Sequence, residues 1–129
     1  MTAHRLSLSL LAETFAICRC DAGAPIPGWA TAGEHWSITR TPDELSVVCP
    51  QIHVPDDVSC EGGWRCLRVA GTLDFALTGI LASLAMPLAQ VGISIVALST
   101  YATDYLLIKE HNLARAIAVL SESGHQIQS

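Results

Sequence analysis

The ten-residue segment "AGTLDFALTG", residues 70–79, brings together groups that suit a small zwitterionic ligand. Amides in the first turn of a helix lack an intrahelical partner and carry partial positive charge, so they attract carboxylates. Amides near residues 76–79 would receive a carboxylate, and Asp74 would face an ammonium group. The candidate ligand-binding residues of this segment are Thr72, Leu73, Asp74, Phe75, Ala76, Thr78 and Gly79.

The same segment also has a purely structural interpretation. Asp74 or Thr78 would then cap the helix that follows, because short polar side chains accept bonds from first-turn amides. Gly71 and Gly79 would let the backbone approach closely in either case. Capping and ligand binding are compatible, so the sequence leaves both interpretations open.

A second polar cluster, "STYATDY" at residues 99–105, lies between two apolar runs. We include Ser99, Thr100 and Asp104 among the candidate ligand-binding residues. The alternative is a hairpin turn, in which threonine and aspartate side chains bond to their own backbone.

No further pattern in the sequence indicates catalysis or a metal centre. Cys18 and Cys20 lack partners at the spacing of zinc ligands, and the five histidines form no i,i+4 pair. The acidic pair at 56–57 fits a solvated turn, and there is neither a nucleophile elbow nor a phosphate-binding glycine loop. We therefore predict no catalytic residues, no metal ligands and no cofactor.

The elements that must position the two clusters begin with a mostly apolar run, residues 75–103, which contains no Asp, Glu, Lys or Arg and is long enough to raise the question of a membrane span. Its apolar residues recur at intervals of three and four as far as Val91, and Gly92 suits the end of a helix. The β-branched stretch after Gly92 favours a strand. We predict a helix over 77–91, kinked at Pro87, and a strand over 93–100, neither of which spans a membrane.

The remainder of the second half continues the same alternation of elements. A strand is expected near 64–71, a hairpin partner near 104–110, a helix from a cap at Asn112 to Gly124, and a short final strand. The resulting order β-α-β-β-α-β is that of a ferredoxin-like fold, with two helices on one face of a four-stranded antiparallel sheet.

The first half is less regular. Strand patterns occur near 5–11, 14–20, 35–41 and 44–49, separated by a Pro- and Gly-rich stretch. The segment at 50–63, which again contains prolines and a glycine pair, indicates a boundary near residue 61. We therefore divide the chain into modules at 1–61 and 62–129.

Composition limits the partners and the compartment. The formal net charge is −5 and seven Lys and Arg are scattered singly, which argues against binding of nucleic acid. Five cysteines without a regular framework fit a reducing compartment. The N-terminal apolar residues alternate like a strand and stop at Glu13, so we interpret them as mature structure rather than a signal peptide. The expected location is the cytoplasm.

Two stretches of the sequence, "TRTPDELSVVCP" and "GWRCLRVAGTLDFALTGILASLAMPLAQVGISIVALSTYATDYLLIKEHNLARAIAVL", resemble small bacterial proteins with tandem ACT domains. Those proteins are similar to the regulatory region of aspartate kinases and to cytosolic arginine sensors of animals. The resemblance implies an α+β protein with two ferredoxin-like (βαββαβ) modules, the N-terminal one degenerate. It also implies antiparallel sheets with helices on one face, and small ligands, usually amino acids, at module or subunit interfaces.

The prediction for function is a regulatory or sensor module that binds a small molecule, an amino acid first of all, without catalytic activity. Exposed sheet edges and the apolar content predict a homodimer. One alternative is an interaction or oligomerisation module with no small ligand. A small ferredoxin-like enzyme is the other alternative, and the fold by itself does not argue for it.

Overall fold

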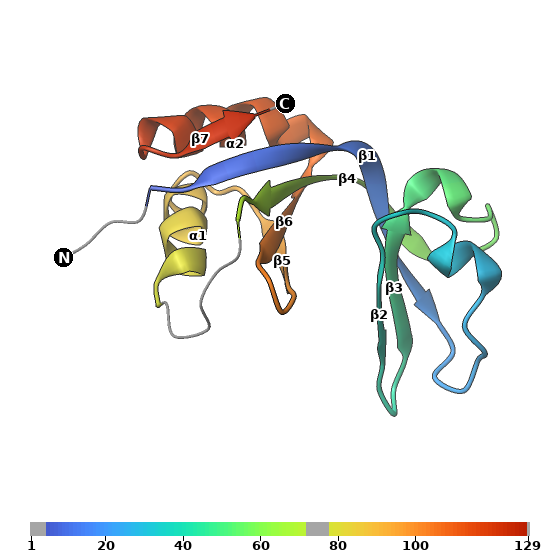
Figure 1. Ribbon diagram of the computed structural model, residues 1–129. Helices are drawn as coiled ribbons and strands as arrows, with labels where there is room; N and C mark the ends of the chain where they lie inside the picture. The colour runs from blue at the N-terminus through green and yellow to red at the C-terminus, as the bar shows by residue number, and fades with distance from the viewer. Residues whose placement is uncertain (1–4, 72–77, 129) are drawn as a thin grey trace. The chain divides into compact units, whose positions relative to one another are not determined.

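The chain folds into two compact units, residues 1–12 with 65–129 and residues 13–64. We call them the helical unit and the inserted unit. The computed structural model describes residues 5–71 and 78–128 (Figure 1). This division differs from the predicted boundary near residue 61, because residues 1–12 belong with the second half of the chain.

Both α-helices of the described residues lie in the helical unit, whose elements follow the predicted order from the fourth strand onward. The elements are β4 (Cys60–Val69), α1 (Ile80–Gln90), β5 (Ile95–Ser99), β6 (Asp104–Lys109), α2 (Glu110–Glu122) and β7 (Gln126–Gln128). The order β-α-β-β-α-β is therefore confirmed.

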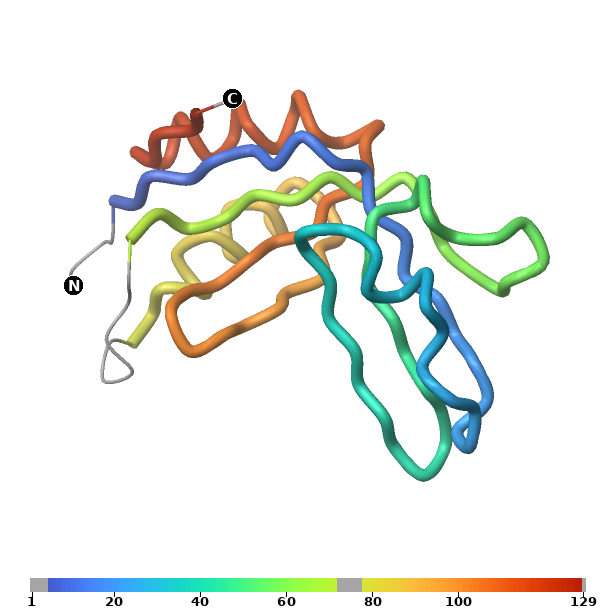
Figure 2. The backbone as a smooth tube through the Cα atoms, turned by 45° about the vertical axis from the view of Figure 1, so that its right-hand side comes forward, coloured from blue at the N-terminus to red at the C-terminus, as the bar shows by residue number. Residues whose placement is uncertain are grey.

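The sheet of the helical unit differs from the predicted four-stranded antiparallel one. Strand β1 (Ser7–Cys20) lies between β7 and β4, so the strand order here is β7-β1-β4-β6-β5. Figure 2 shows the start of β1 running beside both β4 and the C-terminal strand. The β1–β7 pairing is parallel, with Leu8 opposite Ile127, whereas β5 and β6 pair antiparallel. The N-terminal strand takes the place beside β4 that β7 would occupy in the predicted sheet.

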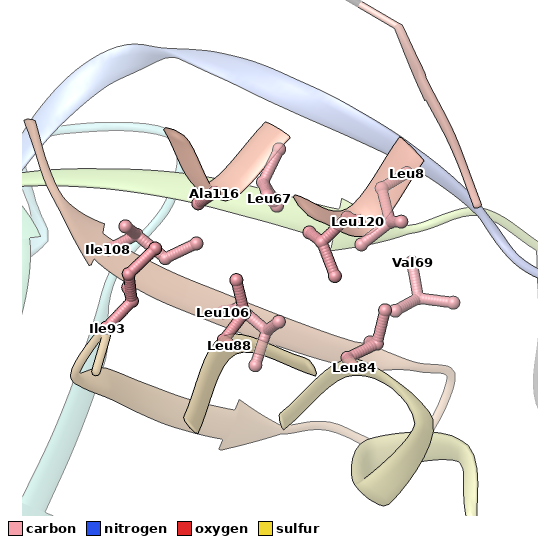
Figure 3. Packing of buried hydrophobic residues seen from close by; sticks show 10 residues of the cluster. All are labelled: Leu8, Leu67, Val69, Leu84, Leu88, Ile93, Leu106, Ile108, Ala116 and Leu120. Atoms are coloured by element: carbon pink, nitrogen blue, oxygen red, sulfur yellow. The ribbon is translucent and has the colours of Figure 1, made fainter. Parts of the chain in front are cut away.

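One hydrophobic core joins both helices to one face of this sheet. Alternate residues of β4 and β6 point toward α1 and α2 (Figure 3), because side chains along a strand alternate between its two faces. The core residues of the two helices and the central strands are Leu84, Leu88, Ala116, Leu120, Leu67, Val69, Leu106 and Ile108. The helices therefore cover one face of the sheet, as predicted.

Helix α1 is shorter than the predicted 77–91. Its end is confirmed: Gly92 has a φ of 74°, and the Ile93 amide donates to the Leu88 carbonyl at 2.9 Å. The buried stripe contains Ile80, Leu84 and Leu88, whereas Leu81 and Val91, which we expected on the same apolar face from their spacing, are exposed. Among the described residues no helix is both long and apolar enough to cross a membrane.

Helix α2 begins earlier than predicted. Its first residue is Glu110 and its N-cap is Lys109, so Asn112 lies inside the helix rather than at its cap. A carboxylate in the first turn interacts favourably with the helix dipole. The predicted end is confirmed, since Gly124 has a φ of 99° and the His125 amide donates to the Leu120 carbonyl.

The inserted unit is built mainly from strands. The two strands expected near 5–11 and 14–20 are one continuous strand, β1, whose second half pairs antiparallel with β3 (Leu45–Pro50). Strand β2 (Ser37–Arg40) forms a hairpin with β3. The helical segments described within 13–64 are two 3-10 turns, η1 (Gly28–Thr31) and η2 (Gln51–His53).

A buried thiol pair gives this unit a dependence on alkaline pH. Cys18 is 1% exposed, and burial, with the neighbouring thiol of Cys49 second, raises its pKa to about 12. Burial also raises the pKa of Cys49. A raised thiol pKa stabilises the fold below the unfolded value, and that stabilisation is lost as pH rises toward the folded value.

We therefore expect the free energy of unfolding to fall above about pH 9, by about 1.4 kcal/mol per pH unit for each such thiol. Urea denaturation under reducing conditions between neutral and alkaline pH measures the slope. Cys18→Ala should reduce the slope, because it removes one of the two buried thiols. If Cys18→Ala leaves the slope unchanged, the pH dependence does not come from the buried thiol of Cys18.

Candidate functional site

The structure describes the two ends of the β4–α1 connection, residues 70–71 and 78–79. At the first end, the Ala70 amide donates to the Ser7 carbonyl at 2.8 Å, which ties the end of β4 to β1. Gly71 and Gly79 have φ values of 83° and 77°, a conformation that glycine adopts without a Cβ penalty. The predicted site residues Thr72, Leu73, Asp74, Phe75 and Ala76 lie outside the described residues.

Thr78 and Gly79 precede helix α1, which places the helix start three residues later than predicted. The N-cap is Gly79, which has no side chain to accept bonds from the first turn. The Ser83 amide bonds to the Gly79 carbonyl at 2.9 Å, so the amides of 80–82 are the ones without an intrahelical acceptor. The anion-attracting turn therefore lies at 80–82 rather than near 76–79.

Helix α1 carries no charged side chain of its own that could compensate its dipole. Residues 80–90 contain no Asp, Glu, Lys or Arg. At the other end, the Arg115 guanidinium of α2 donates to the Val91 carbonyl, which places a cation where a helix dipole is negative. The arrangement favours an anion at the N-terminal turn.

The second predicted cluster forms a closed hairpin between β5 and β6. Ser99 lies opposite Asp104, and its hydroxyl donates to the Asp104 carboxylate at 2.7 Å. The Thr100 hydroxyl donates to the Thr103 carbonyl, and the Thr100 amide reaches the same carbonyl at 2.9 Å. These bonds support the structural interpretation of Ser99, Thr100 and Asp104 as hairpin residues.

Thr103 connects this hairpin to the end of β4. Its side chain is 2% exposed, and its hydroxyl donates to the Val69 carbonyl at 2.8 Å. The hairpin and the first end of the β4–α1 connection are thus held together by a buried bond. Thr103 is absent from the predicted site residues, because a threonine in a polar turn gives no sign of a partner 34 residues away.

Replacing Thr103 by valine should destabilise the protein by about 1–3 kcal/mol, since it leaves a buried carbonyl without its donor at nearly constant volume. Thr100→Val is the matched control. Its turn bonds are only partly buried, and water can replace them at smaller cost. Chemical denaturation measures the free energy of unfolding of both variants. Equal losses would show that the buried bond to the Val69 carbonyl stabilises the protein no more than the turn bonds of Thr100 do.

Metal chemistry finds no support in the described part of the chain. No group of three or more His, Cys, Asp or Glu side chains there is placed to hold a metal ion.

Elsewhere on the sheet the Arg68 guanidinium donates to the Tyr105 hydroxyl at 3.3 Å and so joins β4 to β6.

Comparison with known proteins identifies the fold and the family. A model of the ACT domain matches residues 59–122, which contain β4, α1, β5, β6 and α2. The chain belongs to the ACT-domain family. A second family model, of an N-terminal domain, matches residues 13–57 of this ACT-domain protein, almost the whole inserted unit.

Solved structures extend the likeness over the full ACT-domain protein. The protein Atu0741 from Agrobacterium tumefaciens is 39% identical and superposes with a TM-score of 0.92, over 97% of this chain and 93% of that one. A Vibrio cholerae protein of unknown function, described as a possible transport protein, is 19% identical, with a TM-score of 0.75 over 92% and 90%.

The regulatory subunit of an aspartate kinase has the same fold as this chain. The aspartate kinase regulatory subunit from Thermus thermophilus, in its ligand-free form, is 10% identical with a TM-score of 0.60, over 90% of this chain and 96% of that one. A search of curated protein sequences finds no match. The predicted family is therefore confirmed, and the fold is that of aspartate kinase regulatory domains.

Proposed function

We propose that this ACT-domain protein is a non-catalytic regulatory module that binds a free amino acid at the start of α1. The observation that carries the proposal is the first turn of α1, which begins at a glycine and whose amides at 80–82 have no intrahelical acceptor. A carboxylate is the group that this turn attracts.

The proposed ligand would place its α-carboxylate at these amides and its ammonium group at Asp74. Thr72, Leu73, Phe75, Ala76, Thr78 and Gly79 would surround it along the connection. Ser99, Thr100 and Asp104 would have a secondary role, because the Asp104 carboxylate already accepts a bond from Ser99. The Thr103–Val69 bond would keep the hairpin beside this site.

The test is a thermal shift measurement across the proteinogenic amino acids. A ligand that binds only the native state raises the melting temperature, because it increases the free energy of unfolding. The increase is about 2.7 kcal/mol when the ligand concentration is a hundred times the dissociation constant. One amino acid or a small chemical class should raise it, and the corresponding amine without a carboxylate should not. Equal shifts from both compounds, or no shift from any amino acid, would reject the proposal.

A second candidate function, an oligomerisation module, is favoured by the outer surface of α1. Leu81, Met86 and Val91 are exposed on or next to a helix without charges, and β5 is the last strand at its end of the sheet. Edge strands with free backbone groups tend to pair. We propose that two copies associate through α1 and β5 about a two-fold axis.

Light scattering at tens of micromolar should then give twice the chain mass, and Met86→Glu should shift it toward the single-chain value. A single-chain mass for the unmodified protein would contradict this proposal. Because the ligand test measures binding by itself, the two candidate functions can be separated.

Two further proposals concern organisation and location. We propose that the inserted unit is a reduced counterpart of the ACT module; support comes from the likeness in fold to an aspartate kinase regulatory subunit, which extends over 90% of this chain. We also propose a cytoplasmic location, which the free cysteines support.

A further inference from the structure

Helix α1 contains a proline at its eighth position, and this creates an unusual acceptor. Pro87 has no amide hydrogen, so the carbonyl four residues earlier, that of Ser83, loses its normal intrahelical donor. The Ser83 hydroxyl cannot replace that donor, because it bonds to the Ile80 carbonyl at 2.8 Å. The helix nevertheless continues to Gln90.

His125 supplies the missing donor. Its Nε2 lies 3.1 Å from the Ser83 carbonyl oxygen, and the residue is 4% exposed. The other ring nitrogen, Nδ1, lies 3.1 Å from the Leu6 amide, which can only donate. Nδ1 must therefore accept, which assigns the ring proton to Nε2 and makes Nε2 the donor to Ser83.

The ring of His125 thus connects two segments that are far apart in the sequence. One is the residue before β1, whose carbonyl also accepts the Gln126 amide at 2.9 Å. The other is Ser83, whose own amide bonds to Gly79 and so closes the first turn of α1. Both bonds of His125 are needed for a continuous link from β1 to that turn.

We propose that His125 is a positioning residue that couples the N-terminal strand to the first turn of α1 through the carbonyl freed by Pro87. This turn is the one that would hold the ligand carboxylate, so the relevance to binding rests on the proposed function. The coupling itself is a property of the ligand-free protein and is tested without any amino acid.

The first experiment is amide hydrogen exchange on the full chain and on His125→Phe, which keeps a ring of similar size but neither bond. The Leu6 amide, which loses its acceptor, should exchange about tenfold to a hundredfold faster. The Ser83 amide keeps its bond to the Gly79 carbonyl, and it should also exchange faster because the first turn of α1 loses its link to the N-terminal strand. The Thr100 amide, bonded to the Thr103 carbonyl in the same unit, measures any general loosening and should change less. Equal acceleration at all three amides would overturn the proposal.

The second experiment is a double-mutant cycle with Pro87→Ala, which restores an amide donor for the Ser83 carbonyl. His125→Phe should raise the unfolding equilibrium constant about tenfold to a hundredfold alone and clearly less in the Pro87→Ala background. The side-chain oxygen of asparagine can accept from the Leu6 amide. Pro87→Ala should therefore reverse the destabilisation by His125→Asn more completely than the destabilisation by His125→Phe. Exposed His111→Phe is the matched control and should have no effect. Additive effects of the His125 and Pro87 changes would refute the coupling.

These outcomes are independent of the ligand proposal. A failed amino-acid panel together with a positive cycle would reject the binding function and leave the coupling in place. A positive panel with an additive cycle would do the reverse.

Discussion

Replacing Leu84 by alanine should destabilise the helical unit by about 2–5 kcal/mol, because truncating a buried leucine removes its contacts and leaves a cavity. Leu84 is fully buried and belongs to the core that joins α1 to β4, β6 and α2. The substitution removes three carbons from that core and leaves a space that the surrounding residues fill only in part. The first turn of α1 would lose its support with it.

Far-UV circular dichroism under urea is the appropriate measurement, because both described α-helices lie in the helical unit. All three tryptophans lie at or before residue 64, so fluorescence reports the inserted unit separately. Gln90→Ala is the control on the same helix, since Gln90 is exposed and its change should cost less than about 0.5 kcal/mol. Similar losses for both variants would contradict the assigned buried face.

Asp74→Ala should weaken binding of the most strongly shifting amino acid by about 1.5–3 kcal/mol, which is roughly 10- to 150-fold in dissociation constant. The reason is the loss of a charge-assisted hydrogen bond to the ligand ammonium. Isothermal titration calorimetry measures the change, with circular dichroism as the check on folding. Unchanged affinity would remove Asp74 from the site and leave it with a structural role.

Asp104→Ala is the control for this prediction. The Asp104 carboxylate is held by the Ser99 hydroxyl within the hairpin, so its removal should weaken binding less than removal of Asp74. A larger effect at Asp104 would move the ammonium pocket to the hairpin and reverse the two roles.

The sequence by itself determined the features that depend on short-range pattern. The change of period at Gly92 predicted where α1 ends, and Gly124 predicted the end of α2, because a left-handed terminal residue favours glycine. The order β-α-β-β-α-β followed from the same periodicities. The family also followed from sequence, since the quoted stretches cover most of the residues that the ACT model matches.

The start of α1 was less accessible to sequence. Apolar spacing continues smoothly through residue 77, but the positive φ of Gly79 breaks the helical path and delays the first turn to Ile80. The start of α2 was missed for the opposite reason: Asn112 is a good cap by type, yet the strand β6 passes directly into the helix at Glu110.

Only the tertiary structure decided which strands and side chains meet. The insertion of β1 between β7 and β4 depends on pairing between the two ends of the chain, and no local pattern encodes such a partner. The link from Leu6 to His125 spans 119 positions, and the carbonyl it serves lacks its helical donor only because of Pro87. A proline that looked like a local kink is compensated by a histidine from the end of the chain, since a carbonyl that is partly shielded from water gains from any donor that the fold brings to it.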